Sequence, residues 1–567
     1  MDTMTRTEEA AAQRVRLTAG AGRAFDVIAV AALTVVAWLT RWGSLPSDGL
    51  WFDDSWVAAG AMLGSPGELL SVGSGHPGFT AILMAVDSLG GGDLAYLGVP
   101  SLVFGVLATP ALYLGLRSFG YGRAVSTILS AALAVAPIPI LYSGRVKAYA
   151  LDTLLVLLLA VLIPALARRT WRWPIATAWT VTAVVVGTCS GYMLLATAVA
   201  GVILVLHPAG DRRMRMAAVG IQAVVQGAYL AVAQSKSDLA GIEEWMETAY
   251  DGHMTFSWNP LTFGREVLKH LHRLAEVFPL SPGDGRWWSA LLAVLAMAGL
   301  VLGALKGRRQ SETVAARFLL LLVVVAAGGS LVNRFPFGTS NPQPPYLFVR
   351  PLSMGGRHTL WLVPALAIGL GAVAHRARGL VAGSNPLRVG FDALAIVAAV
   401  VIVGAAYEPA PDAPFPGSES AAAFIDASVG PDDGVILTNT STFSFAISTT
   451  TPIAVQETPH HQVGFAPRYL DRRIKNVGYW AATRVSPSQI RSWAADLDRV
   501  FVMWSGPVGG SHRERAGDVL VDGGFTLIGT RTFEWNTVDV YAHLAANRSV
   551  SPGRRVFGAH PDRQMGP

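Results

Sequence analysis

Two adjacent carboxylates, Asp53 and Asp54, stand in the stretch GLWFDDSWVAAG, shortly after an apolar run at 25–43. That run is long enough to cross about 30 Å of hydrocarbon, so the acids directly follow a predicted membrane span. A carboxylate in this position can start a helix, because acids suit helix N-termini, or it can take a proton from a reacting group. Alone, the two acids favour the structural interpretation.

Cations and aromatic side chains gather at a second predicted membrane boundary, in LYSGRVKAYALD (141–152). An ionisable group at this depth is costly unless it is paired or used. The anion that naturally lies there is a lipid phosphate, which Arg binds bidentately and Lys as a point charge. The candidates are Tyr142, Arg145, Lys147, Tyr149 and Asp152 here, with His76 in an earlier loop and Arg357 before a later span.

Each candidate also has a structural interpretation. Arg145 and Lys147 could extend to the headgroups, and tyrosines are common in interfacial belts. Asp152 could pair with one of the two cations. His76 is interpreted mainly as a residue that orders its loop.

Together, these residue types could catalyse a reaction in which an acceptor displaces a lipid phosphate from a sugar. Asp53 would take the proton of an acceptor hydroxyl while the phosphate leaves the anomeric carbon of a sugar, which is an inverting reaction. Arg145, Lys147 and Arg357 would stabilise the charge that develops on the phosphate.

The elements that must position these residues are membrane helices. The composition, 52% hydrophobic and 14% charged, excludes an ordinary soluble globular protein. About eleven apolar runs have the length of a span, and helices satisfy the backbone in lipid. The predicted spans are 25–43, 97–117, 124–142, 149–167, 174–190, 192–207, 217–234, 287–305, 314–332, 358–375 and 388–406.

Basic residues occupy every second loop between these spans, which predicts a cytoplasmic N-terminus and exterior segments at 44–96, 235–286, 333–357 and after 407. The net charge of +6 therefore reflects topology and gives no reason to expect nucleic acid as a partner. The first span is interpreted as an uncleaved signal anchor in a plasma membrane. Cys189 is the single cysteine, which excludes an intramolecular disulfide.

The chain is expected to comprise a cytoplasmic tail (1–23), a membrane domain (24–406) and a soluble exterior domain (407–567). After a Pro-rich linker, the last region alternates predicted helices and strands, which favours a small α/β domain. It carries no phosphate-binding glycine signature, and His460 and His461 lack partners at zinc-ligand spacing.

The order of the motifs resembles that of the polyprenyl-phosphate-sugar-dependent glycosyltransferases of the GT-C fold, the group that includes protein O-mannosyltransferases and the lipid A aminoarabinose transferase. The resemblance covers roughly residues 25–375. The family pattern L-W-Y-D-E is matched by Leu50 to Asp54, H-P-P by His76 to Gly78, the Tyr- and Arg-rich stretch by Tyr142 to Asp152, and a late Arg-to-Pro stretch by Arg357 to Pro364. The departures are Asp54 in place of Glu and Gly78 in place of a second Pro.

This resemblance implies a helical GT-C membrane domain and Asp53, the first acid of the pair, as the base. It implies a polyprenyl-phosphate-linked sugar donor, an exterior glycan, lipid or protein acceptor, and no essential cofactor. A divalent cation near Asp53 and Asp54, which some GT-C relatives use, is the alternative.

Two other classes of protein remain open at this stage. A transporter or flippase of lipid-linked sugars would show inverted repeats, broken helices and charges within the spans. A non-catalytic membrane scaffold would keep the fold without needing the acidic pair. The sequence does not distinguish among sugars or acceptors.

Overall fold

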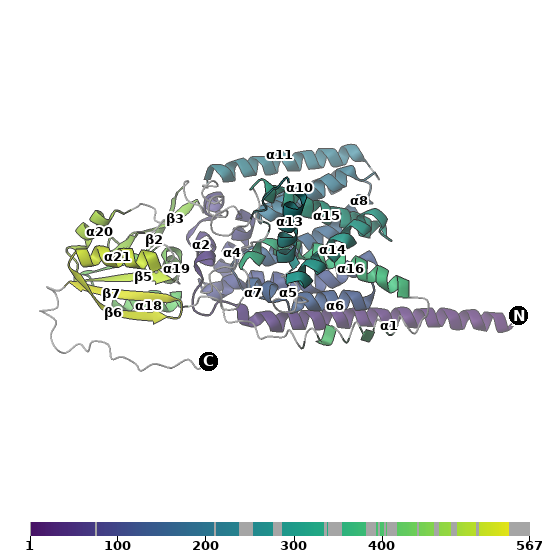
Figure 1. The fold of residues 1–567 in the computed structure, drawn as a ribbon, viewed down its shortest axis with the longest axis horizontal. Helices are drawn as coiled ribbons and strands as arrows, with labels where there is room; N and C mark the ends of the chain where they lie inside the picture. The colour runs from purple at the N-terminus through teal and green to yellow at the C-terminus, as the bar shows by residue number, and fades with distance from the viewer. Residues whose placement is uncertain are drawn as a thin grey trace. The chain divides into compact units, whose positions relative to one another are not determined.

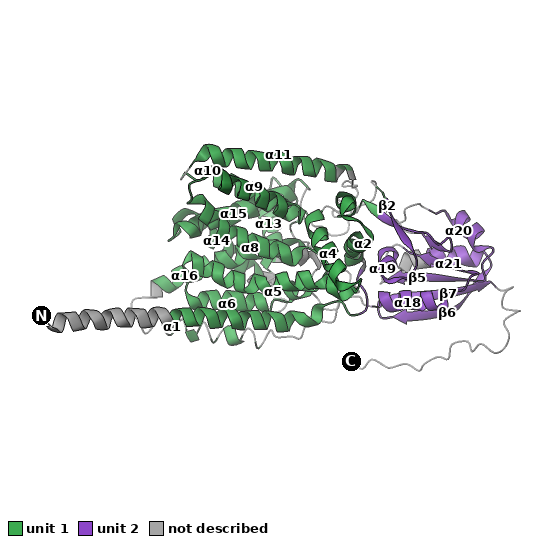
Figure 2. Ribbon diagram, turned by 180° about the vertical axis from the view of Figure 1, so that it is seen from behind, with its two compact units in different colours: residues 1–47, 53–414, 457–465 green, residues 48–52, 415–456, 466–567 purple. Residues whose placement is uncertain are grey.

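The chain folds into two compact units, which are described separately (Figure 2). Residues 1–47, 53–414 and 457–465 form the first unit, and residues 48–52, 415–456 and 466–567 form the second. The computed structural model describes residues 2–73, 76–208, 211–236, 253–275, 286–333, 337, 354–381, isolated helical positions between 390 and 404, 417–438, 441–458, 464–477, 485–505 and 510–543. The boundary predicted at residue 407 lies outside these ranges.

The first unit is a bundle of helices (Figure 1). Helices α2 and α4 lie at the end of the bundle at which α1 ends. The helices are α1 (Asp2–Arg41), α2 (Phe52–Leu63), α3 (Leu69–Val72), α4 (Pro77–Gly90), α5 (Leu94–Phe119), α6 (Arg123–Ala134), α7 (Pro137–Ser143), α8 (Tyr149–Ala167), α9 (Trp173–Gly187), α10 (Gly191–Leu206), α11 (Arg212–Lys236), α13 (Pro260–Ala275), α14 (Arg286–Lys306), α15 (Gln310–Leu331) and α16 (Val363–Val381), with 3₁₀ helices η1 (Trp42–Ser44), η2 (Pro66–Glu68) and η4 (Met354–Leu362).

Within the described residues, seven helices are long and apolar enough to cross a membrane, or eight if the bent pair α6 and α7 is one span. The polytopic helical membrane protein expected from the sequence is therefore confirmed. The seven are Gly22–Ser44, Leu94–Phe119, Tyr149–Ala167, Arg212–Ala233, Ser289–Lys306, Gln310–Leu331 and His358–Gly379.

Two of the predicted spans form apolar helices that are shorter than the seven just described. The predicted spans 174–190 and 192–207 fold as α9 and α10, which have 15 and 16 residues. At 1.5 Å per residue each is about 23 Å long, less than the ~30 Å of a hydrocarbon core. The apolar run breaks at Ser190, whose hydroxyl accepts a hydrogen bond from the backbone of Met193 and starts α10. The predicted span at 388–406 lies mostly outside the described residues.

The predicted span 124–142 is a broken helix rather than a straight one. Helices α6 and α7 meet at an angle of 57°. Pro137 begins α7 and Pro139 follows in its first turn, and neither proline can donate the backbone hydrogen bond that would continue α6. The Tyr142–Lys147 stretch begins in the last turn of α7.

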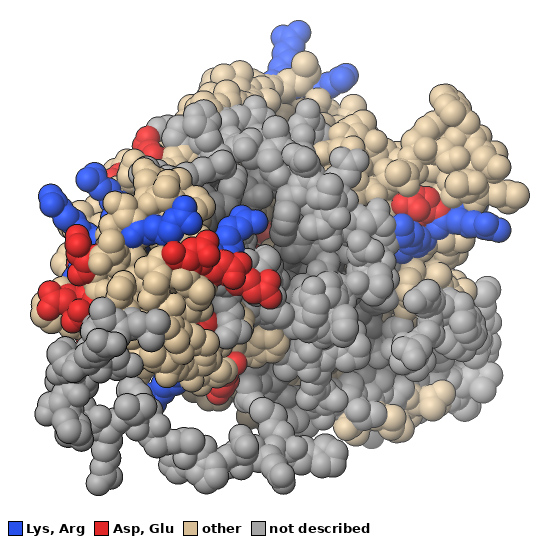
Figure 3. Space-filling model, turned by 60° about the vertical axis from the view of Figure 1, so that its left-hand side comes forward, with Lys and Arg blue, Asp and Glu red and all other residues tan. Residues whose placement is uncertain are grey.

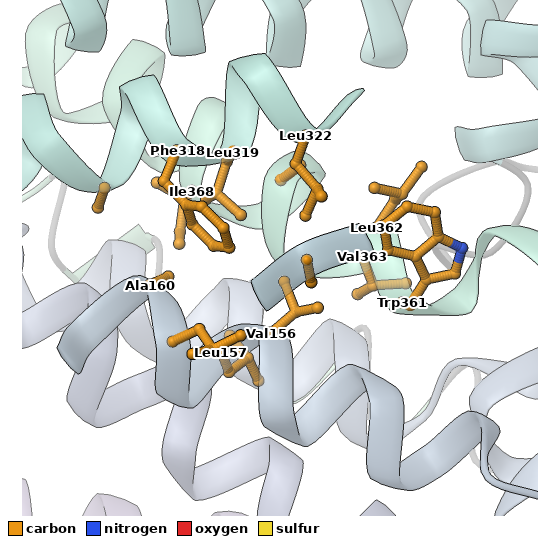
Figure 4. Close-up of a cluster of buried hydrophobic side chains, with 14 of the residues drawn as sticks. Val156, Leu157, Ala160, Phe318, Leu319, Leu322, Trp361, Leu362, Val363 and Ile368 are labelled. Atoms are coloured by element: carbon orange, nitrogen blue, oxygen red, sulfur yellow. The ribbon is translucent and has the colours of Figure 1, made fainter. Parts of the chain in front are cut away.

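The core of the bundle is apolar and tightly packed. Figure 4 shows Val156 and Leu157 of α8 facing Phe318 and Leu322 of α15, with Trp361 of η4 beside them. These side chains hold α8 and α15 against the start of α16, so the helix that begins at Tyr149 has a fixed position in the bundle.

Helices α14 and α16 approach each other at two glycines. A Cβ atom added at Gly299 would lie 1.9 Å from the carbonyl oxygen of Gly369, and one added at Gly369 would lie 2.1 Å from the carbonyl oxygen of Ala296. Small residues permit such backbone contact between membrane helices, where packing drives association.

The second unit is the α/β domain expected from the sequence. Its sheet has the order β4-β1-β5-β7-β6, in which β4, β1 and β5 are parallel and β7 and β6 are antiparallel to their neighbours. Strands β2 and β3 form a separate sheet. The elements are α18 (Ser418–Ser428), β1 (Asp433–Leu437), α19 (Thr442–Ser448), β2 (Ile453–Glu457), β3 (Phe465–Tyr469), β4 (Ile474–Asn476), α20 (Pro487–Ala494), β5 (Arg499–Ser505), α21 (Gly510–Asp522), β6 (Phe525–Phe533) and β7 (Asn536–His543).

The described surface carries charges of both signs. On the face in Figure 3, acidic and basic side chains lie beside one another, and its described part has no wide area of a single sign.

The glycine contact between α14 and α16 predicts that a Gly→Ala substitution changes the free energy of unfolding differently inside and outside the contact. Gly369→Ala is expected to lower the free energy of unfolding in detergent by about 1–3 kcal/mol, because its Cβ atom overpacks the contact. Gly328→Ala in α15, where a Cβ atom meets nothing within 4 Å, is expected to be neutral or to stabilise by up to about 1 kcal/mol. Unfolding curves that move equally for both variants would contradict the packing described.

Candidate functional site

The acidic pair lies in the first turn of α2, and both side chains are buried. Asp53 is 7% exposed and Asp54 is 2% exposed. Acidic side chains suit this place, because the N-terminal end of a helix carries a partial positive charge. The two acids are therefore not part of a solvated loop.

Asp54 forms a buried ion pair with Arg145. The Nη2 atom of Arg145 donates to Oδ1 of Asp54 at 3.1 Å, and its Nε atom donates to Oδ2. The side chains are 3% and 5% exposed. Burial alone would lower the pKa of the Arg145 guanidinium, but the charge and hydrogen bonds of Asp54 outweigh burial and raise that pKa. The Arg145 guanidinium therefore remains charged.

Aromatic rings flank the two cations of the Tyr142–Lys147 stretch. The guanidinium carbon of Arg145 lies 5.8 Å from the centre of the Tyr142 ring. The Tyr142 and Tyr149 rings contact each other edge to face at 5.2 Å. The ammonium of Lys147 lies 4.2 Å from the centre of the Trp56 ring, on the same helix as the acids. Arg145 and Lys147 thus both face α2. Trp56 was not among the residues predicted from the sequence, although it stands one turn after Asp53.

Close backbone contacts fix the segment that carries these cations. A Cβ atom at Gly144 would lie 1.8 Å from the carbonyl oxygen of Ser44, and one at Gly105 of α5 would lie 2.1 Å from Oγ of Ser143. The hydroxyl of Ser101, also on α5, donates to the carbonyl of Lys147 at 2.9 Å. Only small residues allow α5 to lie this close, so the segment cannot shift without a clash.

The hydrogen bond described for Asp152 is to Ser190 and not to Arg145 or Lys147. It lies in the first turn of α8, is 1% exposed, and accepts a hydrogen bond from the hydroxyl of Ser190 at 2.7 Å. The same Ser190 hydroxyl caps α10 by accepting from the backbone of Met193 at 3.2 Å. Asp152 therefore connects α8 to the start of α10.

The His76–Gly78 motif packs on the turn before α10. His76 precedes α4, Pro77 is its first residue, and the backbone N–H of Gly78 donates to the carbonyl of Thr188 at 3.0 Å. A Cβ atom at Gly78 would lie 2.6 Å from the Thr188 hydroxyl. A second proline could neither donate this bond nor fit, which accounts for glycine at this position.

The predicted residue Arg357 falls on η4, and its side chain lies outside the described part of the structure. The next residue, His358, is 5% exposed, and its Nδ1 atom lies 2.8 Å from the hydroxyl of Tyr192. The Tyr192 ring stacks on Trp361 at 5.0 Å. This aromatic group was not predicted, since Tyr192 and Trp361 are far apart in the sequence.

Among the described residues, no group of three or more His, Cys, Asp and Glu side chains could hold a metal ion. The expected absence of an essential metal, and the alternative of a divalent cation near Asp53 and Asp54, both stay predictions.

No family model matches the sequence, and no curated protein matches it. Among solved structures, the crystal structure of ArnT from Cupriavidus metallidurans bound to undecaprenyl phosphate is similar, with a TM-score of 0.50 and 12% sequence identity over 91% of this chain and 97% of that chain. The structure of the same ArnT in the apo state has a TM-score of 0.49 and 11% identity over 93% and 99%. The likeness confirms the predicted GT-C fold, including a helical membrane part and a C-terminal sheet domain.

The ion pair between Asp54 and Arg145 predicts strong coupling in a double-mutant cycle. Asp54→Ala and Arg145→Ala are each expected to lower the free energy of unfolding in detergent by about 3–5 kcal/mol, because each leaves a buried charge uncompensated. The double variant should lose about 1–3 kcal/mol less than the sum of the two.

The control is the exposed pair Arg491 and Asp522, whose closest charged atoms are 3.6 Å apart and whose side chains are 44% and 67% exposed. Its coupling should stay below about 1 kcal/mol in the same cycle. Additive losses at Asp54 and Arg145 would show that the buried pair does not stabilise the protein.

Proposed function

We propose that this chain is an integral-membrane glycosyltransferase that moves a sugar from a polyprenyl-phosphate donor to an acceptor outside the cytoplasm. The observation that carries the proposal is the meeting of a buried acidic pair with Arg145 and Lys147 in a membrane bundle of the GT-C fold. The solved ArnT of the same fold holds undecaprenyl phosphate. The protein is proposed to lie in the plasma membrane, with its N-terminus in the cytoplasm.

Asp53 is the proposed general base, and the contacts of Asp54 support that choice. Both carboxylate oxygens of Asp54 accept hydrogen bonds from Arg145, so protonation of Asp54 would break a buried ion pair. Asp53 is its neighbour on the same helix turn, and the charge of Asp53 also acts on Arg145. Asp54 then fixes the cation, and Asp53 takes the proton.

The proposed reaction is a single inverting displacement. The acceptor hydroxyl oxygen bonds to the anomeric carbon, the bond from that carbon to the phosphate oxygen breaks with its electron pair, and the hydroxyl proton moves to Asp53. Polyprenyl phosphate leaves with the charge that Lys147, Arg145 and Arg357 stabilise. General-base assistance of this kind contributes about 10²–10⁴-fold in rate.

The broken span α6–α7 favours the transporter alternative, because transporters often bind ions at broken helices. Here the C-terminus of α6 is already occupied. The carbonyls of Leu133 and Ala134 accept hydrogen bonds from Arg41, and Ala134 also accepts from the Thr40 hydroxyl. A cation in that place keeps a transported cation away from these carbonyls, so the break supports the enzyme better than the transporter. A non-catalytic scaffold would not need the charged site.

Asp53→Asn is expected to lower sugar transfer by about 10²–10⁴-fold without changing folding or binding of polyprenyl phosphate, because the amide cannot accept the proton. Transfer is measured with radiolabelled polyprenyl-phosphate sugars and a panel of glycan, lipid and protein acceptors.

Asp93→Asn is the matched control. Asp93 caps α5 by accepting from the backbone of Ala95, and asparagine caps helices equally well, so transfer should not change. Equal transfer by the Asp53→Asn variant and the wild type would remove the proposed mechanism. No transfer and no polyprenyl-phosphate binding by the folded wild type would remove the proposed function.

Lys147→Gln is expected to weaken binding of polyprenyl phosphate by about tenfold or more, because a hydrogen bond between charged groups contributes about 1.5–3 kcal/mol. Lys147→Arg keeps the charge and should lose less. The dissociation constant is measured with purified protein in nanodiscs. An unchanged constant for Lys147→Gln would exclude Lys147 as a phosphate ligand.

A further inference from the structure

The end of α1 carries a fully buried guanidinium that the proposed chemistry does not use. Arg41 is 1% exposed. Its Nη1 atom donates to the carbonyl of Ala134 at 2.7 Å and to the Thr40 hydroxyl at 3.1 Å, and its Nη2 atom donates to the carbonyl of Leu133 at 3.0 Å. The described partners of Arg41 are neutral oxygens, and none of them is a carboxylate.

The negative end of α6 compensates this buried charge. Leu133 and Ala134 are the last residues of α6, and their carbonyls lack the donors of a continuing helix, although that of Leu133 also accepts from the backbone N–H of Val135. The partial negative charge at a helix C-terminus attracts a cation. Because of the 57° break, no helix continues α6 in the same direction. Arg41 donates hydrogen bonds to the carbonyls at this end instead.

The same guanidinium also reaches the far side of the break. Its Nε atom donates to Oγ of Ser143 at 3.1 Å, and Ser143 is the last residue of α7. The absence of a side chain at Gly105 makes this contact possible, since a Cβ atom there would lie 2.1 Å from Ser143 Oγ and 3.4 Å from Arg41 Nε. Arg41 therefore bonds to the end of α6 and to the end of α7 at once.

We propose that Arg41 is a positioning residue for the candidate site. By bonding to the end of α6 before the break and to the last residue of α7 after it, Arg41 sets the angle between α6 and α7, and hence the place of the segment that begins at Gly144. That segment brings Arg145 to Asp54 and Lys147 to Trp56. The effect on transfer rests on the proposed function, whereas the effect on the segment does not.

A second buried arginine provides a matched comparison. Arg215 is 0% exposed and donates to the carbonyls of Ala167, Leu204 and His207 at 2.9, 3.1 and 3.0 Å. It thus bonds to the ends of α8 and α10 with the same chemistry, but none of its partners lies in the Tyr142–Lys147 stretch. A purely structural role for buried arginines predicts the same functional behaviour for both.

The experiment measures hydrogen exchange and transfer for Arg41→Gln and Arg215→Gln in nanodiscs. Arg41→Gln is expected to speed exchange of backbone amides at 135–148 by about tenfold or more, since the bonds to Leu133 and Ala134 directly before that region and to Ser143 within it are lost. Arg215→Gln should speed exchange near Leu204 to His207 and leave 135–148 unchanged. Arg41→Lys keeps the charge and should restore part of the protection.

Transfer per folded molecule is expected to fall on the order of 10²-fold in Arg41→Gln, mainly in kcat, because a small displacement of catalytic groups is costly. Arg215→Gln should transfer at the wild-type rate. If Arg41→Gln does not fold, Ser143→Ala removes the Nε contact with little change in volume and should give the same pattern more weakly.

Exchange at 135–148 that is the same in the variants and the wild type would overturn the proposal. Faster exchange there with unchanged transfer per molecule would also overturn it, because the segment would then not position the reacting groups. Failure of the proposed function is recognised separately, by a folded wild type that neither transfers sugar nor binds polyprenyl phosphate; the exchange result still decides whether Arg41 holds the segment.

Discussion

The buried ion pair between Asp54 and Arg145 is the interaction on which the candidate site depends. Two opposite charges with side chains 3% and 5% exposed are tolerated only as a pair, because either one alone would be desolvated without compensation. The pair joins the first turn of α2 to the segment between α7 and α8. It therefore fixes the spacing between Asp53 and Lys147, the two groups that the proposed reaction needs as base and phosphate ligand.

A second constraint in this bundle is that the carbonyl groups at helix ends need hydrogen-bond donors. Arginines supply them. Arg41 bonds to the end of α6, and Arg215 bonds to the ends of α8 and α10. Arg376 donates to the carbonyls of Leu302 and Lys306 at the end of α14 at 3.2 and 3.1 Å, and to Glu312 at 3.2 Å. A guanidinium suits this role because its five donors are fixed in one plane and it stays charged when buried. Breaks and ends in the helices are thus stabilised without an ion from outside.

Small residues determine where these polar contacts can form. Gly105 admits the contact between Arg41 and Ser143, and Gly144 lies against the backbone of Ser44. Gly78 allows the first turn of α4 to bond to Thr188. The same physical reason applies in each case: a hydrogen bond across a membrane bundle needs close approach, and a Cβ atom at these positions would prevent it.

The sequence by itself determined the class of the fold, and it supplied the residues of the candidate site as predictions. Apolar runs predict spans because hydrophobic length is a local property, and the order of motifs indicated the GT-C fold. Tertiary structure decided which groups pair: Arg145 bonds to Asp54, 91 positions earlier, whereas Asp152 bonds to Ser190. It also decided the break between α6 and α7, the contact of Trp56 with Lys147 and the hydrogen bonds of Arg41. Pairing depends on the distance and direction between helices, which a hydropathy pattern does not contain, since it records only how far each segment avoids water.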